Sequence, residues 1–230
     1  MSSQSAGAAM KFRAAQRVNR SLTAEAEKRA LVWMAEQTPR WVTSDRLTLL
    51  GFSAQAGAGL CYALSRYDRW ALLLACLCLG LNWLGDSLDG TLARVRRQQR
   101  PRYGFYVDHM VDIFGAAALM GGLAWSDLLH GVTAAALLVG FLLLAGESYL
   151  ATHTLGRSEM SQGFFGPTEI RILLVAGTIR AFGTPYVRVI GHRMLLFDAG
   201  GAIAAGAMLA MAAAVGIRHT AQLYRQEPLP

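Results

Sequence analysis

Four aspartates at fixed spacing carry the clearest chemical signal in the sequence. Asp86 and Asp89 close one strongly apolar segment, and Asp108 and Asp112 open the next. On a helix, each pair falls on one face, about one turn apart. Clustered carboxylates repel one another, and they are costly to bury beside apolar segments unless a cation lies among them. Oxygen ligands suit a hard divalent ion, so the sequence predicts a magnesium or manganese site at a membrane surface.

The residues around these aspartates extend the pattern. The aspartates belong to two blocks, Asp86-x2-Asp89-Gly90-x2-Ala93-Arg94 and Gly104-x3-Asp108-x3-Asp112. The pattern specifies eight residues within a stretch of 27, and nine residues lie between the two blocks. This pattern resembles the signature of the CDP-alcohol phosphotransferase (CDP-alcohol phosphatidyltransferase) family, with the spacer at the long end of its range. Eight identities at fixed spacing are far more specific than a lone glycine-rich loop. The alternative, ordinary surface aspartates in a loop, is therefore the weaker interpretation.

The resemblance implies a reaction and a role for each carboxylate. Enzymes of this family move a substituted phosphate group from a CDP-linked alcohol to an acceptor hydroxyl and release CMP, in phospholipid biosynthesis. The resemblance implies two Mg²⁺ or Mn²⁺ ions held by Asp86, Asp89, Asp108 and Asp112. Our hypothesis is that Asp112 is shared between metal contact and catalysis, where it accepts the proton of the acceptor hydroxyl.

Four further motif residues are the predicted substrate-binding set. Gly90 and Ala93 would leave room for the nucleotide against the helix, and Arg94 would fork onto a phosphate. Gly104 would allow a turn or a close approach beneath the diphosphate. The alternative for the glycines is a role in helix packing, which is common in membrane proteins.

Composition indicates a membrane protein. Of the 230 residues, 53% are hydrophobic and 16% charged, and the mean hydropathy is +0.31. Long uncharged runs separate the charges, as in polytopic membrane proteins. The net charge of +7 comes from arginines that stand beside apolar runs and not among aromatic stacking groups. The expected partners are therefore membrane lipids and a nucleotide diphosphate, and nucleic acid is not expected to bind. Cys61, Cys76 and Cys78 lie in apolar segments and are interpreted as small buried residues.

The predicted fold is all-α, a polytopic membrane helical bundle with six transmembrane helices. The expected spans are 47–65, 70–88, 105–125, 131–150, 168–183 and 197–217, and the signal for 168–183 is the weakest. Residues 22–37 predict either an interfacial amphipathic helix or a solvated helix packed on the protein. The expected organisation is an N-terminal cytoplasmic or interfacial segment (1–40), the transmembrane domain (41–218) and a cytoplasmic tail (219–230).

The charged loops predict the orientation. The connection 95–103 is too basic to cross a membrane easily, so it should stay in the cytoplasm with both chain ends. The active site would then lie near the cytoplasmic face of an integral membrane protein, in the inner membrane if the chain is bacterial. The resemblance also implies a homodimer.

Other polar residues leave alternatives open. Four ionisable residues within the apolar segments could together form a pocket for the acceptor or a headgroup: Glu147, Glu169, Arg171 and Arg180. Alternatively, Glu147 or Glu169 pairs with Arg171 in a purely structural role. His109 is interpreted as a packing residue in preference to a ligand, and Asp198 as a cap of the last helix. Thr48 and Arg46 could contact a substrate, or they could anchor the helix in lipid. Ser44 and Asp45, just before them, stand where the family commonly has Pro-Asn.

Two questions of function remain open at this stage. The donor could be CDP-diacylglycerol with a small alcohol, or a CDP-aminoalcohol with a diacylglycerol-like lipid. The Asp108-His109 pair and the Thr48-to-Phe52 stretch are similar to the second, choline and ethanolamine type, but the residues do not separate the two. A membrane transporter or proton relay is the alternative class, since intramembrane carboxylates also mark ion paths. It predicts carboxylates spread across membrane depth or inverted repeats, whereas these crowd at one end. A catalytically inactive scaffold has no positive feature.

Overall fold

The computed structural model describes residues 24–155 and 167–227. The N-terminal segment up to residue 23 and most of the connection after residue 155 therefore lie outside the described residues. The described chain forms seven helices and one β-hairpin: α1 (Ala24–Gln37), α2 (Ser44–Leu64), α3 (Ala71–Val95), α4 (Pro101–Trp125), α5 (Gly131–Thr154), α6 (Pro167–Gly183), β1 (Tyr186–Val189), β2 (His192–Leu195) and α7 (Leu196–Gln226).

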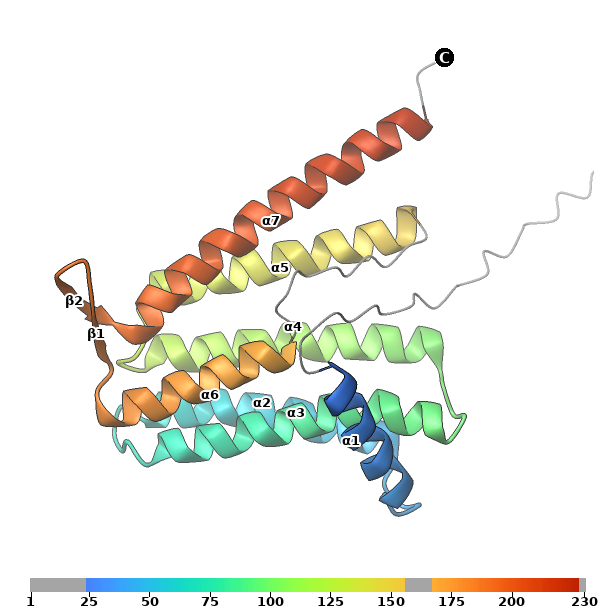
Figure 1. Ribbon diagram of the computed structural model, residues 1–230, viewed down its shortest axis with the longest axis horizontal. Coiled ribbons are helices and arrows are strands. Elements are labelled where there is room, and N and C mark those ends of the chain that lie inside the picture. Colours follow the sequence, from blue (N-terminus) through green and yellow to red (C-terminus); the bar gives the residue numbers. More distant parts are fainter. Residues whose placement is uncertain (1–23, 156–166, 228–230) are drawn as a thin grey trace, which may run out of the picture.

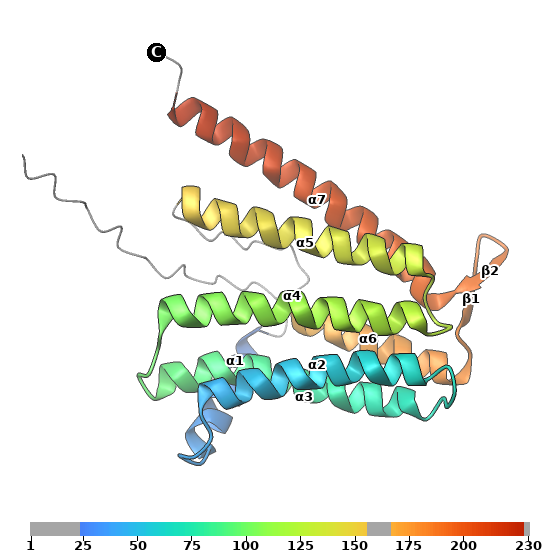
Figure 2. The same ribbon diagram turned by 180° about the vertical axis from the view of Figure 1, so that it is seen from behind.

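The long helices run alongside one another, up and down the bundle (Figures 1 and 2). Helix α2 packs most extensively on α3 and α4, and α6 lies against α3. Helices α5 and α7 form a second pair, joined to the rest mainly where α5 meets α4. The hairpin lies at one end of the bundle, and the α3–α4 loop lies at the other (Figure 1). These two ends carry the features discussed below.

The predicted helical membrane bundle is confirmed. Five helices, α2, α3, α4, α5 and α7, are long and apolar enough to cross a membrane. Helix α6 forms where the weakest span was expected, but its 17 residues extend only about 25 Å at 1.5 Å per residue. The hydrocarbon core of a bilayer is about 30 Å thick. Six full crossings therefore stay a prediction.

Glycines bring the helix backbones of the bundle into direct contact. A methyl group added at Gly85 of α3 would lie 2.6 Å from the backbone nitrogen of Gly51 in α2. One added at Gly122 of α4 would lie 1.9 Å from the carbonyl oxygen of Gly59 in α2. Such close approach is typical of membrane helices, where small residues permit packing that larger side chains would block. Helix α2 is therefore held tightly between α3 and α4.

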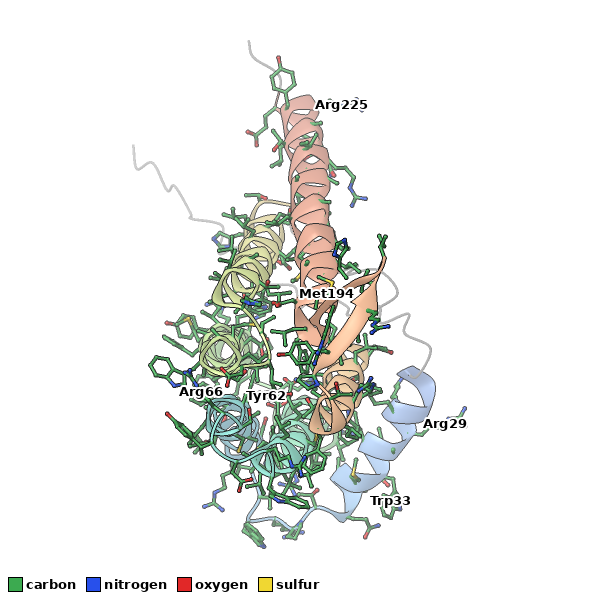
Figure 3. The ribbon with its side chains drawn as sticks, turned by 90° about the vertical axis from the view of Figure 1, so that its left-hand side faces the viewer. Arg29, Trp33, Tyr62, Arg66, Met194 and Arg225 are labelled. Atoms are coloured by element: carbon green, nitrogen blue, oxygen red, sulfur yellow. The ribbon has the colours of Figure 1, made fainter. Side chains whose placement is uncertain are left out.

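A buried hydroxyl pair links α6 to the same core. Tyr62 of α2 is fully buried among the helices, as Figure 3 shows, and its hydroxyl lies 2.6 Å from that of Thr178 in α6. Thr178 also donates to the carbonyl oxygen of Leu174, 2.6 Å away. Both polar groups thus have partners, as burial in an apolar interior requires.

Helix α1 packs on the protein across α3. Leu31 and Ala35 are buried in a small cluster with Leu47, Leu88 and Leu92. Glu27 accepts hydrogen bonds from the Trp83 indole and the Thr168 hydroxyl, both at 2.9 Å. The packed-helix interpretation of this segment is therefore confirmed. Trp33 and Trp41 remain exposed, and an interfacial role for that outer face stays a prediction.

The α3–α4 loop is shorter than the sequence suggested, because both helices extend into the motif. Helix α3 continues through the first motif block to Val95. It ends where Arg97 takes a left-handed conformation (φ 56°) and the amide of Gln98 reaches back to the carbonyl of Ala93 at 2.9 Å. Pro101 then starts α4, at a position where its missing N–H costs nothing. The two motif blocks are thus separate helical ends joined by a tight turn.

Candidate active site

A narrow cleft between α2, α3 and α4 contains all four motif aspartates. Asp86 and Asp89 come from α3, and Asp108 and Asp112 come from α4. Helix α2 supplies the third wall, and the full lining is Thr48, Gly51, Phe52, Gln55, Asn82, Asp86, Asp89, Asp108, Val111 and Asp112. The residues predicted to hold a metal are therefore gathered at one place near the α3–α4 loop. The sequence reasoning missed Gln55 and Val111, which have no distinctive local pattern.

Asp89 is the most deeply placed of the four carboxylates. Its exposed fraction is 7%, and Thr48 of α2 donates a hydrogen bond to its Oδ2 at 2.5 Å. Ser44 Oγ donates to the main-chain oxygen of the same residue at 3.0 Å. Asp89 also lies close enough to Asp86 and Asp108 for their negative charges to repel. The start of α2 thus fixes the position of the buried carboxylate.

Asp86 is oriented by an arginine from α6. Arg171 Nη2 lies 2.7 Å from Asp86 Oδ2, and Arg171 Nε lies 2.8 Å from Asn82 Oδ1. Asn82 in turn donates to the carbonyl oxygen of Gly51 at 3.0 Å. The network joins α6, α3 and α2 at the wall of the cleft. It gives Arg171 a defined role, which the sequence alone left open.

The predicted pocket of four ionisable residues does not form as a unit within the described chain. Glu147 of α5 pairs with His219 of α7 at 2.5 Å, so it is not the partner of Arg171. Arg180 donates to the carbonyl oxygen of Thr184 at the opposite end of α6. The reason is geometric, since Arg171 and Arg180 stand more than two helical turns apart.

Replacing Arg171 with glutamine is expected to lower the thermal unfolding midpoint of the purified protein. The change removes two hydrogen bonds that involve a charged group and leaves Asp86 without this partner, a loss of about 1 to 3 kcal/mol. Arg171→Lys should restore only part of the stability, because lysine lacks the planar fork that reaches both Asp86 and Asn82. The matched control is Arg180→Gln. An Arg171→Gln midpoint equal to that of the control would contradict the role.

Helix α5 supplies an aromatic neighbour to the second aspartate pair. Tyr149 lies near enough to Asp112 for electrostatic interaction. The ring of His109 packs against Tyr149 and Phe105, with centroids 4.5 and 4.1 Å away, and its Nδ1 contacts the carbonyl of Phe105. His109 does not line the cleft, so its interpretation as a packing residue is confirmed. Tyr149 was not recognised from sequence, because nothing local links it to the motif.

The four predicted substrate-binding residues flank the carboxylate cleft without lining it. Arg94 folds back along α3 and donates to Thr91 Oγ1 at 2.9 Å. Among the residues that the structure describes, a methyl group added at Gly90 would meet only the tip of the Arg94 side chain, at 3.4 Å, and one added at Gly104 would have none within 4 Å. Neither glycine is therefore a packing glycine. Ala93 follows on the last turns of α3, so the set borders open space beside the aspartates.

The two residues that depart from the usual Pro-Asn contact the first motif block and the loop between the two blocks. Thr43 caps α2 by accepting from the amide of Arg46. Next to it, Ser44 holds the backbone of Asp89, and Asp45 pairs with Arg100 just before α4. That hydrogen bond from Arg100 to Asp45 raises the pKa of the guanidinium above its usual range. Arg46 itself donates to the carbonyl of Trp41.

Asp198, expected to cap its own helix, instead binds the start of α5. Its Oδ1 accepts from the amide of His130 at 2.9 Å, and its Oδ2 contacts the His130 ring. The side chain makes no cap for α7, which begins at Leu196. The correction follows from packing, since α5 and α7 lie side by side and α5 offers its free N-terminal amides nearby.

The donor atoms of the cleft fit a hard divalent cation. Carboxylates dominate the lining, joined by the Thr48 hydroxyl and the side-chain amides of Gln55 and Asn82. Oxygen ligands of this kind suit Mg²⁺ or Mn²⁺, whereas a softer metal would favour thiolate or imidazole. Among the residues that the structure describes, no three acidic, histidine or cysteine side chains are already gathered in a metal-ligand arrangement. Instead, Asp86 is bound by Arg171, and Asp89 by Thr48.

Comparison with known families agrees with the motif and the fold. The sequence model for CDP-alcohol phosphatidyltransferases matches residues 38–217, which include α2 to α6 and most of α7. No curated protein matches the chain closely enough to count as a relative. The match covers most of the chain and contains the whole cleft. The protein therefore belongs to the CDP-alcohol phosphatidyltransferase family, integral membrane transferases that use a CDP-alcohol donor and a hydroxyl acceptor in phospholipid synthesis.

Proposed function

We propose that this protein moves a substituted phosphate group from a CDP-linked alcohol to an acceptor hydroxyl, that one of the two substrates is a lipid, and that Mg²⁺ or Mn²⁺ is required. The observation that carries the proposal is the meeting of four aspartates from two helices in one cleft. The same placement argues against a transporter, since a proton or ion path needs carboxylates at several membrane depths. The lining of the cleft does not distinguish CDP-diacylglycerol from a CDP-aminoalcohol as the donor.

The divalent ions would be held by Asp86, Asp89, Asp108 and Asp112, and when bound they would neutralise the diphosphate and make CMP a better leaving group. The chain's own residues prepare these ligands. Thr48 fixes the Asp89 carboxylate, and Arg171 holds Asp86 at the rim. Because the groups are positioned before substrate arrives, little reorganisation is needed during the reaction.

Asp112 is the proposed general base. The acceptor oxygen forms a bond to the phosphorus that bears the donor alcohol, and the bond from that phosphorus to the bridging oxygen breaks. The bridging oxygen leaves with CMP, and the acceptor proton passes to the Asp112 carboxylate. Asp112 stands one helical turn beyond Asp108 on α4 and faces the cleft that Asp86 and Asp89 line from α3. Such an arrangement suits a group that meets the acceptor while its neighbours hold the donor.

The open space beside the aspartates is the proposed nucleotide site. Gly90 and Gly104 present bare backbone there, and Arg94 can unfold from Thr91 to reach a phosphate. The site lies at the end of the bundle with the basic α3–α4 loop, whose arginines support a cytoplasmic location.

Replacing Gly104 with leucine is expected to weaken nucleotide binding at least tenfold without loss of folding. A Cβ atom at position 104 meets no described residue within 4 Å, so stability should be unchanged. The leucine side chain would clash with a bound nucleotide at a cost of about 1.5 to 3 kcal/mol, which is about tenfold or more in affinity. Binding is measured by titration with CDP. Gly80→Leu, on an open face of α3, is the matched control, and unchanged CDP affinity in Gly104→Leu would contradict the placement.

One assay tests the proposed function as a whole. The purified full-length protein in detergent receives radiolabelled CDP-alcohols one at a time, with candidate acceptors and either Mg²⁺ or Mn²⁺, and CMP release is followed. We expect release with one donor class, and its loss when a chelator removes the divalent ions. Absence of CMP release with every donor, combined with metal-independent solute uptake into proteoliposomes, would favour the transporter instead.

A further inference from the structure

The β-hairpin between α6 and α7 has an unusual tip. Ile190 and Gly191 form its two-residue turn, with φ angles of 50° and 82°. Turns of this kind need positive φ at both positions and favour Asn-Gly. A β-branched residue there is strained. Ile190 is nonetheless used, and its side chain is 93% exposed, the highest value among the exposed large hydrophobic residues that the structure describes. The sequence accepts backbone strain to present an apolar group at the tip.

Two arginines stand opposite each other just behind this tip. Arg188 of β1 pairs in register with Arg193 of β2, so both side chains project from the same face. Like charges directly opposite one another destabilise a strand pair. Arg193 stacks on the Tyr186 ring, 4.1 Å from its centroid. Within the described residues, neither arginine has a carboxylate at ion-pair distance, so an external anion would relieve their repulsion.

The hairpin stands at the level where lipid headgroups are expected. It follows α6 and leads directly into the spanning helix α7, at the end of the bundle opposite the carboxylate cleft (Figure 1). At the same end, where α2 passes into α3 and where α4 stops, Tyr67, Trp70 and Trp125 are 78%, 61% and 64% exposed. Exposed Trp and Tyr at helix ends mark the membrane interface. At this boundary, acyl chains lie on the bilayer side and phosphates lie on the water side, so an apolar tip beside paired arginines suits it.

We propose that this hairpin is a lipid-binding element. Ile190 enters the interface of the leaflet opposite the active site, and Arg188 and Arg193 together bind the phosphate of an anionic phospholipid in that leaflet. A planar guanidinium pairs well with phosphate oxygens, and two of them on one face form a clamp. Of the other arginines at this end, Arg66 pairs with Asp127, Arg180 donates to the carbonyl oxygen of Thr184, and Arg69 lies over the Phe182 ring. The element would anchor the start of α7.

The depth of Ile190 is the first test. Full-length protein in which the three native cysteines are replaced by alanine receives a nitroxide at Ile190→Cys and is placed in phosphatidylcholine and phosphatidylglycerol nanodiscs. The label should be more accessible to oxygen than to a water-soluble nickel complex, as expected at Ile203→Cys on the lipid-facing side of α7. Accessibility matching that of Gln99→Cys, in the exposed α3–α4 loop, would overturn the proposal.

The binding of anionic lipid is the second test. Phosphatidylglycerol is titrated into the protein in neutral detergent, and bound lipids are counted by native mass spectrometry. Its apparent affinity should fall about fivefold for each of Arg188→Gln and Arg193→Gln, while phosphatidylcholine binding stays unchanged. The matched control is Arg225→Gln, at the far end of α7 (Figure 3). Gel filtration verifies that each variant is folded. Wild-type affinity in the folded double variant would overturn the proposal.

Discussion

Replacement of Asp112 by asparagine should lower the rate of CMP release by about 10² to 10⁴-fold, while binding of the CDP-alcohol is retained. Asparagine has nearly the same size, and the three aspartates proposed to serve the metal alone keep their charges, but asparagine cannot take up the proton of the acceptor hydroxyl. The effect should fall on kcat, since the lost interaction arises only as the reaction proceeds. The measurement is CMP release under saturating donor, with CDP affinity determined separately on the same preparation.

Two further variants make this result specific. Asp108→Asn removes a proposed metal ligand on the same helix, so it should weaken CDP binding as well as turnover. Asp127→Asn changes an exposed carboxylate at the opposite end of the bundle and should leave both unchanged. Unaltered turnover in Asp112→Asn would remove the base assignment. Loss of CDP binding in that variant would instead assign Asp112 to the metal site alone.

Insertion of a single methyl group at Gly122 is expected to destabilise the whole bundle. In Gly122→Ala the new carbon would lie 1.9 Å from the carbonyl oxygen of Gly59 and 2.4 Å from its carbonyl carbon. Both atoms belong to the backbone of α2, so no side chain can move aside. Overpacking of a core costs about 1 to 3 kcal/mol and sometimes more, and a backbone clash belongs at the upper end. The expected result is a markedly lower thermal midpoint.

The neighbouring glycine provides the matched control. A methyl group at Gly121 has no atom of the described chain within 4 Å, and alanine is the better helix former by about 1 kcal/mol. Gly121→Ala should therefore be neutral or slightly stabilising in the same assay. Gly122→Ala should also lose CDP binding, because α2 and α4 carry opposite walls of the cleft. Equal midpoints for the two variants would show that these helices are less tightly packed than described.

The motif aspartates were predictable because helical periodicity is a local property. Spacing alone places Asp86 with Asp89 on one face and Asp108 with Asp112 on another. The apolar runs likewise predicted the membrane helices. The spacing of residues along one helix does not reveal which residue of another helix will contact them. Arg171 reaches Asp86 over 85 positions of sequence, and Thr48 reaches Asp89 over 41.

Pairs between distant helices were missed for the same reason. The sequence offered Arg171 as a partner for Glu147, whereas the structure gives Glu147 to His219. Asp198 looked like a helix cap, yet its carboxylate serves the start of another helix. Each residue type was recognised as unusual in an apolar segment, but its partner depends on which helices become neighbours. Which helices become neighbours is determined by their packing, including the glycine contacts that α2 makes with α3 and α4.

The hairpin illustrates a different limit. Its strands have four residues each, too few for alternation to stand out from the apolar runs on either side. Ile190-Gly191 lacks the usual asparagine, so the turn gives no strong local signal. In the sequence, Arg188 and Arg193 are only two charges shortly before the last apolar run. Their pairing across the strands emerged only from the register.

The central claim is that divalent ions bind among the four aspartates and hold a cytidine diphosphate there. Its most direct measurement is a titration of the purified protein with Mn²⁺, followed by electron paramagnetic resonance, with and without CDP. We predict saturable Mn²⁺ binding that CDP strengthens, and its loss in Asp89→Asn and in Asp108→Asn. Wild-type protein without saturable binding, or Asp89→Asn and Asp108→Asn proteins that bind Mn²⁺ and CDP as wild type does, would contradict the account.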